Sequence, residues 1–300
     1  MKRRKMVGLV AGVVALAGAA LAPAAQATGT TTAGATAACT TRVGSVTAAG
    51  GHSAADVIAG TPPTMTKPGV EPGVYPPGKV RVSTQFIAEP NVAGVDRYGY
   101  VIEGDSLYYH FYNPSVTDPV LKRVGGGWTN FTALEISSYT QAKPYHTFAY
   151  GLRSDGTLFR WSLGSGWKAA GSATGFASVK SIALISKTGT YDTFLANTRG
   201  GALYTIRIPV SAPMKPIVKQ VRAKTWQGFE KLIVEKCGKS GGTMVVGIDE
   251  DTNSGYAYAF GHANGTATVI NGLGKVNGTF ADDVYFRWGV VSDLDPINGE

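Results

Sequence analysis

The strongest constraint on the fold is a pattern of aromatic and aliphatic residues that returns about every 50 residues. Its clearest copy reads Trp128-x-x-Phe131-x-x-Leu134-x-Ile136, and further copies begin at Phe176 and Trp226. Weaker copies begin at Val80 and Phe280, so successive starts lie 48, 48, 50 and 54 residues apart. A repeat of this length is one supersecondary unit that cannot bury its hydrophobic face alone. The chain is therefore predicted to pack several such units against one another.

A second element lies 27 to 31 residues after four of the five repeat starts. It reads Ser154-Asp155-Gly156-x-Leu158-Phe159, with matching segments at 199–204 and 253–258 and a partial match at 104–108. Asp-Gly and Gly-Gly pairs supply the positive φ of a tight hairpin turn, and the Leu-aromatic pair begins the returning strand. Forty glycines among 300 residues agree with many turns. Hydrophobic residues alternate with polar ones, and amphipathic helix patterns are missing, which predicts an all-β fold.

Three or four short strands in each unit are typical of a β-propeller blade. Five blades are favoured, with four as the alternative, in which the strand near Phe280 joins the sheet that begins near Tyr98. The last unit, from Phe280 to Glu300, has room for only one or two strands. Closing the ring then needs a strand from the other end of the chain, and the segment Cys39–Val46 is the candidate.

The N-terminal part of the chain has a different composition. Residues 1–27 combine a basic start, a short apolar stretch and an Ala-Gln-Ala cleavage site, which predicts a secretory signal peptide. An uncleaved membrane anchor is the alternative, and the stretch is short and interrupted by Pro23. Residues 28–79, rich in Thr, Ala, Gly and Pro, are interpreted as a flexible leader and linker. The domain is assigned to residues 80–300, and the mature protein is predicted to be secreted and extracellular, with no membrane insertion.

The net charge indicates which partners to expect, and the cysteine content indicates which disulfide can form. Removing residues 1–27 lowers the net charge from +8 to +4, and the rest of the chain has no dense Lys/Arg run, so nucleic-acid binding is not expected. In an oxidising compartment, the simplest arrangement of the two cysteines is a disulfide between Cys39 and Cys237. Two unpaired buried thiols are the alternative.

No catalytic motif emerges from the sequence. The four histidines lack zinc-ligand spacing, no Gly-x-Ser-x-Gly elbow is present, and no cofactor is expected. The stretch Asp249–Gly255 begins like a calcium loop, but it also fits the hairpin turn of its repeat, and the question stays open. The acidic residues near the C-terminus, at positions 282, 283, 293 and 295, favour a solvated rim over the carboxylate pair of a glycosidase. The chain is thus predicted not to be an enzyme, although a secreted enzyme stays a third possibility.

A sugar site needs aromatic faces for apolar C–H patches and a few polar groups for hydroxyls. Candidates near the predicted turns and repeat starts are Trp128, Asp155, Trp167, Arg199, Trp226, Asp251, Asn253 and Tyr256. Asp and Asn favour turns in any case, and tryptophans at repeat starts also suit core packing between units.

A Trp-x-x-Phe element is followed by a Gly-x-Leu-aromatic element, at Gly127 to Phe131 and Gly156 to Phe159. This combination resembles the tachylectin-like five-bladed propeller lectins. The resemblance covers about 220 residues. It implies binding of N-acetylated sugars between loops of adjacent blades. The expected function is therefore a secreted, non-enzymatic, lectin-like protein that binds glycans. A protein-interaction adaptor, or a subunit of a secreted bacterial assembly of toxin type, is the alternative.

Overall fold

The computed structural model describes residues 39–115, 117–291 and 297–300. The predicted signal peptide and the beginning of the predicted leader lie outside this range. All of these described residues belong to one compact unit. They form 22 strands. Within these same ranges, no helix has the length and apolar character needed to cross a membrane.

Three four-stranded antiparallel sheets follow the three strongest copies of the repeat. Their strands are consecutive in the chain, as in a series of hairpins. The sheets consist of β10 (Phe131–Tyr139), β11 (His146–Arg153), β12 (Leu158–Ser162) and β13 (Lys168–Ala173); β14 (Val179–Lys187), β15 (Tyr191–Thr198), β16 (Leu203–Pro209) and β17 (Ile217–Arg222); and β18 (Lys231–Cys237), β19 (Gly242–Asp249), β20 (Ser254–Phe260) and β21 (Ile270–Lys275). The predicted all-β class and the predicted repeat unit are confirmed.

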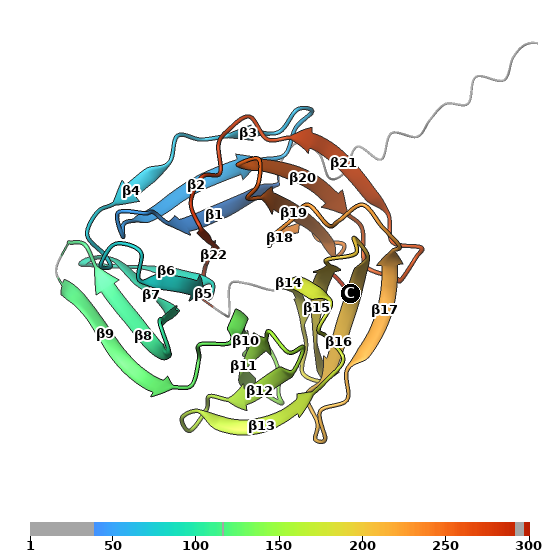
Figure 1. Cartoon of the computed structure of the whole chain (residues 1–300), viewed down its shortest axis with the longest axis horizontal. Helices are drawn as coiled ribbons and strands as arrows, with labels where there is room; N and C mark the ends of the chain where they lie inside the picture. Colours follow the sequence, from blue (N-terminus) through green and yellow to red (C-terminus); the bar gives the residue numbers. More distant parts are fainter. Residues whose placement is uncertain (1–38, 116, 292–296) are drawn as a thin grey trace, which may run out of the picture. The chain divides into compact units, whose positions relative to one another are not determined.

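The remaining strands form one ten-stranded sheet whose main path is β3-β2-β1-β22-β6-β7-β8-β9. Its strands are β1 (Thr40–Val46), β2 (His52–Ile58), β3 (Thr64–Met65), β4 (Gly69–Glu71), β5 (Val80–Ser83), β6 (Phe86–Asn91), β7 (Gly94–Glu103), β8 (Ser106–Asn113), β9 (Thr117–Gly126) and β22 (Val284–Gly289). Only two residue pairs, in a short parallel contact between β22 and β6, join its two halves. In Figure 1 the sheets stand side by side around a central axis, and these halves occupy neighbouring sectors.

The first strand, β1, and the last strand, β22, lie side by side in one sheet. Strand β1 pairs antiparallel with β22, in a register that places Val43 opposite Arg287. This pairing confirms the prediction that the segment Cys39–Val46 completes the last unit. Residues 39–79, which were interpreted as leader and linker, contain β1 to β4. Alternating buried residues in β1 and β2 explain why this segment packs with the domain.

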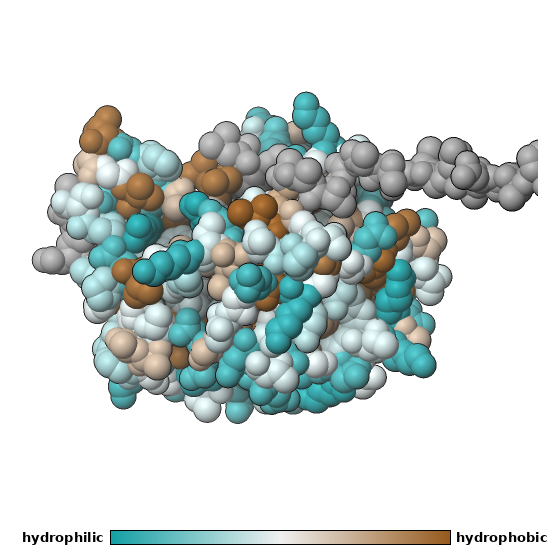
Figure 2. All heavy atoms as spheres, turned by 90° about the horizontal axis from the view of Figure 1, so that it is seen from above, coloured by the Kyte–Doolittle hydropathy of each residue, from teal (hydrophilic) through white to brown (hydrophobic). Residues whose placement is uncertain are grey.

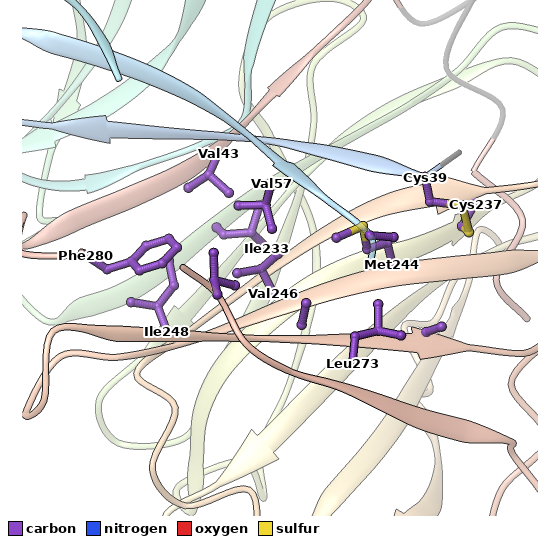
Figure 3. Packing of buried hydrophobic residues seen from close by; sticks show 14 of the residues in the cluster. Cys39, Val43, Val57, Ile233, Cys237, Met244, Val246, Ile248, Leu273 and Phe280 are labelled. Carbon is purple, nitrogen blue, oxygen red and sulfur yellow. A yellow bond between two sulfur atoms is a disulfide. The ribbon is translucent and has the colours of Figure 1, made fainter. Parts of the chain in front are cut away.

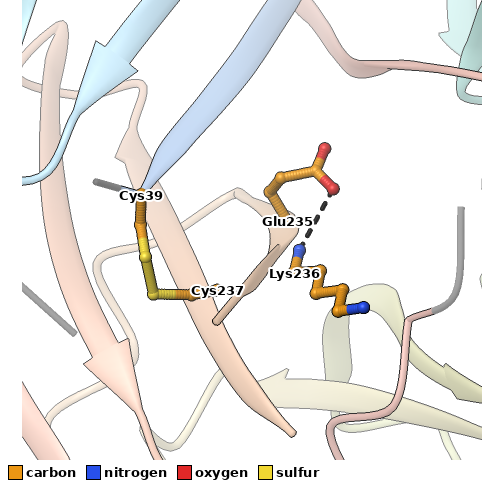
Figure 4. Close-up of a disulfide and its surroundings, with 4 residues drawn as sticks. All are labelled: Cys39, Glu235, Lys236 and Cys237. Atoms are coloured by element: carbon orange, nitrogen blue, oxygen red, sulfur yellow. Dashed lines mark hydrogen bonds between the residues drawn. A yellow bond between two sulfur atoms is a disulfide. The ribbon is translucent and has the colours of Figure 1, made fainter. Parts of the chain in front are cut away.

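A disulfide joins Cys39, just before β1, to Cys237 at the end of β18, with a Cα–Cα distance of 5.3 Å (Figure 4). The predicted pairing is confirmed. The bond connects the sheet that contains the first and last strands to the neighbouring sheet β18–β21. Both cysteines belong to the hydrophobic cluster shared by these sheets, together with Val43, Val57 and Phe280 (Figure 3). Four further clusters lie between other pairs of neighbouring sheets or half-sheets.

The repeat start ties each unit to the unit before it. The backbone N–H of Trp128 donates to the carbonyl of Asp105 at 3.0 Å, and this carbonyl lies in the preceding hairpin turn. The same contact recurs, also at 3.0 Å, from Phe176 to Gly156, from Trp226 to Gly201 and from Phe280 to Asn253. The two sequence elements therefore recur at a similar spacing because they are hydrogen-bonded to each other across successive units.

Three aromatic rings lie directly against glycines of the strands β7, β11 and β19. A methyl group added to Gly151 would come within 2.9 Å of the Phe131 ring, and one added to Gly247 within 2.8 Å of the Phe229 ring. Gly99 faces Phe86 in the same way. The glycines are thus required by close packing of rings, in addition to their role in turns.

The outermost strands are more exposed than the inner ones. Apolar residues of β9 (Val120, Leu121) and β17 (Ile217, Val218) are exposed. On the face seen in Figure 2, hydrophobic residues lie scattered among hydrophilic ones. Such single exposed residues are ordinary on a soluble surface.

Candidate functional site: the axial cavity and the tyrosine groove

A narrow cavity runs between the five innermost strands, β5, β10, β14, β18 and β22, which surround the centre of Figure 1. We call it the axial cavity. It encloses about 50 Å³, enough for one or two water molecules but too little for a sugar ring.

Two of the charged groups that line the axial cavity come from one position of the repeat, and three others, Lys180, Glu230 and Lys231, come from other positions. Seven residues after the repeat starts at 128, 176, 226 and 280 stand Glu135, Ala183, Ile233 and Arg287, and all four line the cavity. Two equivalent positions are therefore apolar, whereas two carry opposite charges. Packing within the repeat does not require a charge at this position, which makes Glu135 and Arg287 candidates for function.

Enclosure in the axial cavity raises the pKa of Glu135 to about 8, against an ordinary value of 4.5. The nearby positive charge of Arg287 acts in the opposite direction but does not offset the loss of hydration. No hydrogen bond contributes to this shift. The Glu135 carboxyl group is therefore mostly protonated at neutral pH and can donate a proton.

Arg287 connects the axial cavity to a second carboxylate. Its Nη1 lies 3.0 Å from Oε1 of Glu235 on β18, and its Nε donates to Oε1 of Gln85 at 3.1 Å. The Arg287 side chain is 9% exposed and the Glu235 side chain is 22% exposed, so water has limited access to the ion pair. The charge of one arginine thus acts on two carboxyl groups, those of Glu135 and Glu235.

Another set of charges lies where the inner strands begin. Lys180 pairs with Glu230 and donates to the carbonyl of Gln227 at 2.6 Å, and Glu230 accepts the backbone N–H of Glu250 at 2.9 Å. Burial lowers the pKa of Lys231 beside them and raises the pKa of Glu250. These contacts join β14 to β18, and Lys180, Glu230 and Lys231 also line the axial cavity.

A wider groove of about 370 Å³ adjoins the axial cavity, and Gln85 and Leu184 line both. Three tyrosines line it, Tyr98, Tyr100 and Tyr109, and we call it the tyrosine groove. The hydroxyl of Tyr98 donates to Glu89 at 3.1 Å, and burial together with this bond raises its pKa to about 12. Phenol rings with a few hydroxyl and amide groups match the needs of a saccharide site.

The predicted tryptophans have different surroundings. Trp128 and Trp226 are 6% and 4% exposed and belong to hydrophobic clusters between sheets, where Trp128 contacts Phe131 and Trp226 contacts Tyr258. The structure therefore gives them the packing role. Trp167 is partly exposed, and its ring centroid lies 5.2 Å from that of Tyr100 at the tyrosine groove. It is the predicted aromatic residue nearest to the candidate site.

The predicted polar residues lie in hairpin turns of three different sheets and do not converge. Asp155 pairs with Arg153 and accepts the N–H of Thr157 at 2.9 Å. Arg199 donates to the carbonyl of Ala177 at 2.6 Å. Further residues of this set, Asp251, Asn253 and Tyr256, lie in or beside the turn between β19 and β20. Their contacts are those of turn and strand residues.

The structure also shows the surroundings of the possible calcium loop and of three of the histidines. In the turn at 249–255, Asp249 accepts the N–H of Thr252 at 3.0 Å. No group of three or more His, Cys, Asp or Glu side chains is arranged to hold a metal within the ranges that the structure describes. His52 and His110 are buried, and His146 lies 3.1 Å from the buried carboxylate of Asp192. Asp293 and Asp295 lie outside the described residues.

Sequence reasoning missed Glu135, Arg287 and Glu235, although one signal was present. Comparing the variable positions of the repeat, rather than its shared ones, would have singled out the two charges among apolar equivalents. No local sequence motif joins these three groups, because they come from three different inner strands.

The chain matches no family model. It also matches no curated protein. Among solved structures, it is similar to the catalytic domain of a GH62 α-L-arabinofuranosidase from Coprinopsis cinerea, with 11% identity and a TM-score of 0.45, over 69% of this chain and 73% of the other. It is also similar to an α-L-arabinofuranosidase from Podospora anserina in complex with cellotriose, with 12% identity and a TM-score of 0.40, over 69% and 78%. Both are enzymes. This finding contradicts the prediction of a non-enzymatic lectin-like protein or adaptor, and that prediction is wrong.

Proposed function

We propose that this protein is a glycoside hydrolase whose reacting groups are Glu135, which lines the axial cavity, and Glu235, which pairs with Arg287 beside it, and whose substrate occupies the adjoining tyrosine groove. One observation carries the proposal: Glu135 has a pKa of about 8, while Glu235, on the other side of Arg287, is paired with a cation. Two carboxyl groups whose environments push their protonation states apart are the basic equipment of glycosidic bond hydrolysis.

The roles follow from the charges. Glu135, protonated at neutral pH, donates its proton to the oxygen of the leaving group. Glu235, which pairs with Arg287, acts as the second carboxylate. The groove of about 370 Å³ has the volume for a sugar ring, and the adjoining axial cavity has the volume for the attacking water. Tyr98, Tyr100 and Tyr109 offer ring faces to the apolar side of the sugar.

We further propose that the ring is a five-bladed β-propeller. Its blades would be β22-β1-β2 with β3 and β4, then β6-β7-β8-β9 with β5, and then the three separate sheets. The weak two-pair contact between β22 and β6 supports dividing the ten-stranded sheet at that point. Kinship with the tachylectin-like propellers and secretion of the mature chain remain predictions, based on the repeat and on residues 1–27.

The proposal is tested with p-nitrophenyl glycosides and the purified protein. The panel includes an α-L-arabinofuranoside, the substrate class in the names of both similar structures, and an N-acetyl-β-D-glucosaminide, which the tachylectin-like resemblance suggests. Hydrolysis of at least one member is expected. Glu135→Gln should lower kcat by at least about 100-fold, because general acid catalysis contributes about 10² to 10⁴. Glu235→Gln should also lower it.

Lys219→Gln is the matched control, since Lys219 is an exposed residue of the outer strand β17. It removes a charge far from the axial cavity and should leave kcat unchanged. A wild-type protein that hydrolyses no glycoside of the panel, or a Glu135→Gln variant with full activity, would refute the proposal.

A further inference from the structure

A separate cavity of about 390 Å³ lies between the two halves of the ten-stranded sheet, and we call it the seam cavity. It is formed where β22 leaves β1 and meets β6, so Trp288 is both a lining residue and part of the β22–β6 contact. Strands β1, β2 and β4 contribute to one side, and β6 and β7 to the other. The seam cavity shares no lining residue with the axial cavity or the tyrosine groove.

Arg97 is the charged group that is best placed to bind a ligand there. Its guanidinium lies 5.5 Å from the ring centroid of Tyr112 and 5.7 Å from that of Trp288, which hold it against the cavity wall. Its only ion pair in the described ranges is a single approach of 3.5 Å from Nη1 to Glu71. A guanidinium has five N–H donors arranged for bidentate contact with a carboxylate. The Tyr112 hydroxyl also interacts with one of these donors, and the donors that Tyr112 and Glu71 do not use remain for a ligand.

The rest of the seam cavity does not neutralise Arg97. Arg42, the second cation, makes two hydrogen bonds to Asp56, at 2.8 and 3.2 Å, so its charge is already balanced. His52 is 2% exposed, and burial together with the charges of His110 and Arg97 lowers its pKa well below 6.5, so it is neutral. The lining also includes small apolar side chains such as Val95. Glu71 is the one acidic group that lines the described cavity.

We propose that the seam cavity binds a small organic carboxylate, with a sugar acid such as a uronate as the ligand class. The carboxylate would form a bidentate pair with Arg97 in place of its long contact with Glu71. The sugar ring would lie against the apolar wall and the edge of Trp288. The volume of the cavity suits one such ring. This site is distinct from the proposed hydrolytic site and does not depend on it.

The test is calorimetric titration of the full protein with glucuronate and, in parallel, with glucose, which differs from it in lacking the carboxylate. Glucuronate should bind and glucose should not. Arg97→Gln should weaken glucuronate binding by about 10-fold or more, because hydrogen bonds to charged groups contribute about 1.5–3 kcal/mol. Arg97→Lys keeps the charge but loses the planar fork, and it should also bind more weakly.

Two controls separate binding from folding and from the hydrolytic proposal. Urea unfolding of each Arg97 variant reports whether the fold survives, and Lys219→Gln should bind glucuronate like the wild type. Glu135→Gln should also bind glucuronate normally, since Glu135 lines a different cavity. Equal binding of glucose and glucuronate, no binding of glucuronate by the wild type, or unchanged binding by folded Arg97→Gln would overturn the proposal.

Discussion

The disulfide between Cys39 and Cys237 offers a sharp test of how the two ends of the domain are held. The residues are 198 positions apart, so the bond closes most of the described chain into one loop. A crosslink over so long a loop removes much conformational freedom from the unfolded chain. The loop-closure relation gives about 5 kcal/mol of stabilisation at 25 °C for this separation.

The perturbation is the double substitution Cys39→Ala with Cys237→Ala, which replaces two buried sulfurs with small apolar groups. We expect a loss of several kcal/mol in the free energy of unfolding and a fall in Tm of roughly 10–20 °C. Urea denaturation followed by tryptophan fluorescence measures the first quantity, and calorimetry measures the second.

The reducing agent supplies the control. With reductant present throughout the urea series, the wild type loses its crosslink in the unfolded state, and its curve should approach that of the double variant. If the variant and the wild type unfold at the same urea concentration without reductant, the reasoning is refuted. The pairing of β1 with β22 would then hold the ends together unaided.

Three further changes test packing, a buried polar group and the titration of Glu135. Gly151→Ala places a methyl group 2.9 Å from the Phe131 ring and should destabilise the protein by about 1–3 kcal/mol in urea denaturation. Gly200→Ala, with open space around the added methyl group, should not destabilise it. Equal effects of the two substitutions would contradict the close packing of Phe131 on Gly151. Asp192 is fully buried and accepts hydrogen bonds from Ser137 and Tyr150, both at 2.7 Å. Asp192→Ala should therefore lower the free energy of unfolding by about 3–5 kcal/mol in the same assay. A decrease below about 1 kcal/mol would argue against a stabilising role of these hydrogen bonds. Because the folded protein keeps the Glu135 proton up to a pKa of about 8 while the unfolded chain releases it near 4.5, wild-type stability should fall as pH rises between these values. Glu135→Gln should lack this decline, and identical pH profiles of the two proteins would show that the carboxyl group is not enclosed.

The sequence by itself determined the sheets and the way in which the chain ends meet. Repeat starts such as Trp128 and turns such as Asp155-Gly156 mark the sheets because hydrophobic alternation and turn chemistry are local properties of neighbouring residues. The pairing of the segment Cys39–Val46 with the last unit was also predictable, since the short final unit needed further strands. A disulfide to Cys237 followed from there being only two cysteines.

The tertiary structure alone decided where the proposed reacting groups lie. Glu135 and Arg287 come from strands far apart in the chain, and only the ring arrangement brings them into one narrow cavity. The pKa of Glu135 depends on the removal of water by that enclosure, which no local pattern encodes. The same holds for Trp128 and Trp226, which suited sugar stacking in the sequence but lie between sheets. Desolvation and burial are properties of the assembled core, so they emerge only when distant segments pack together.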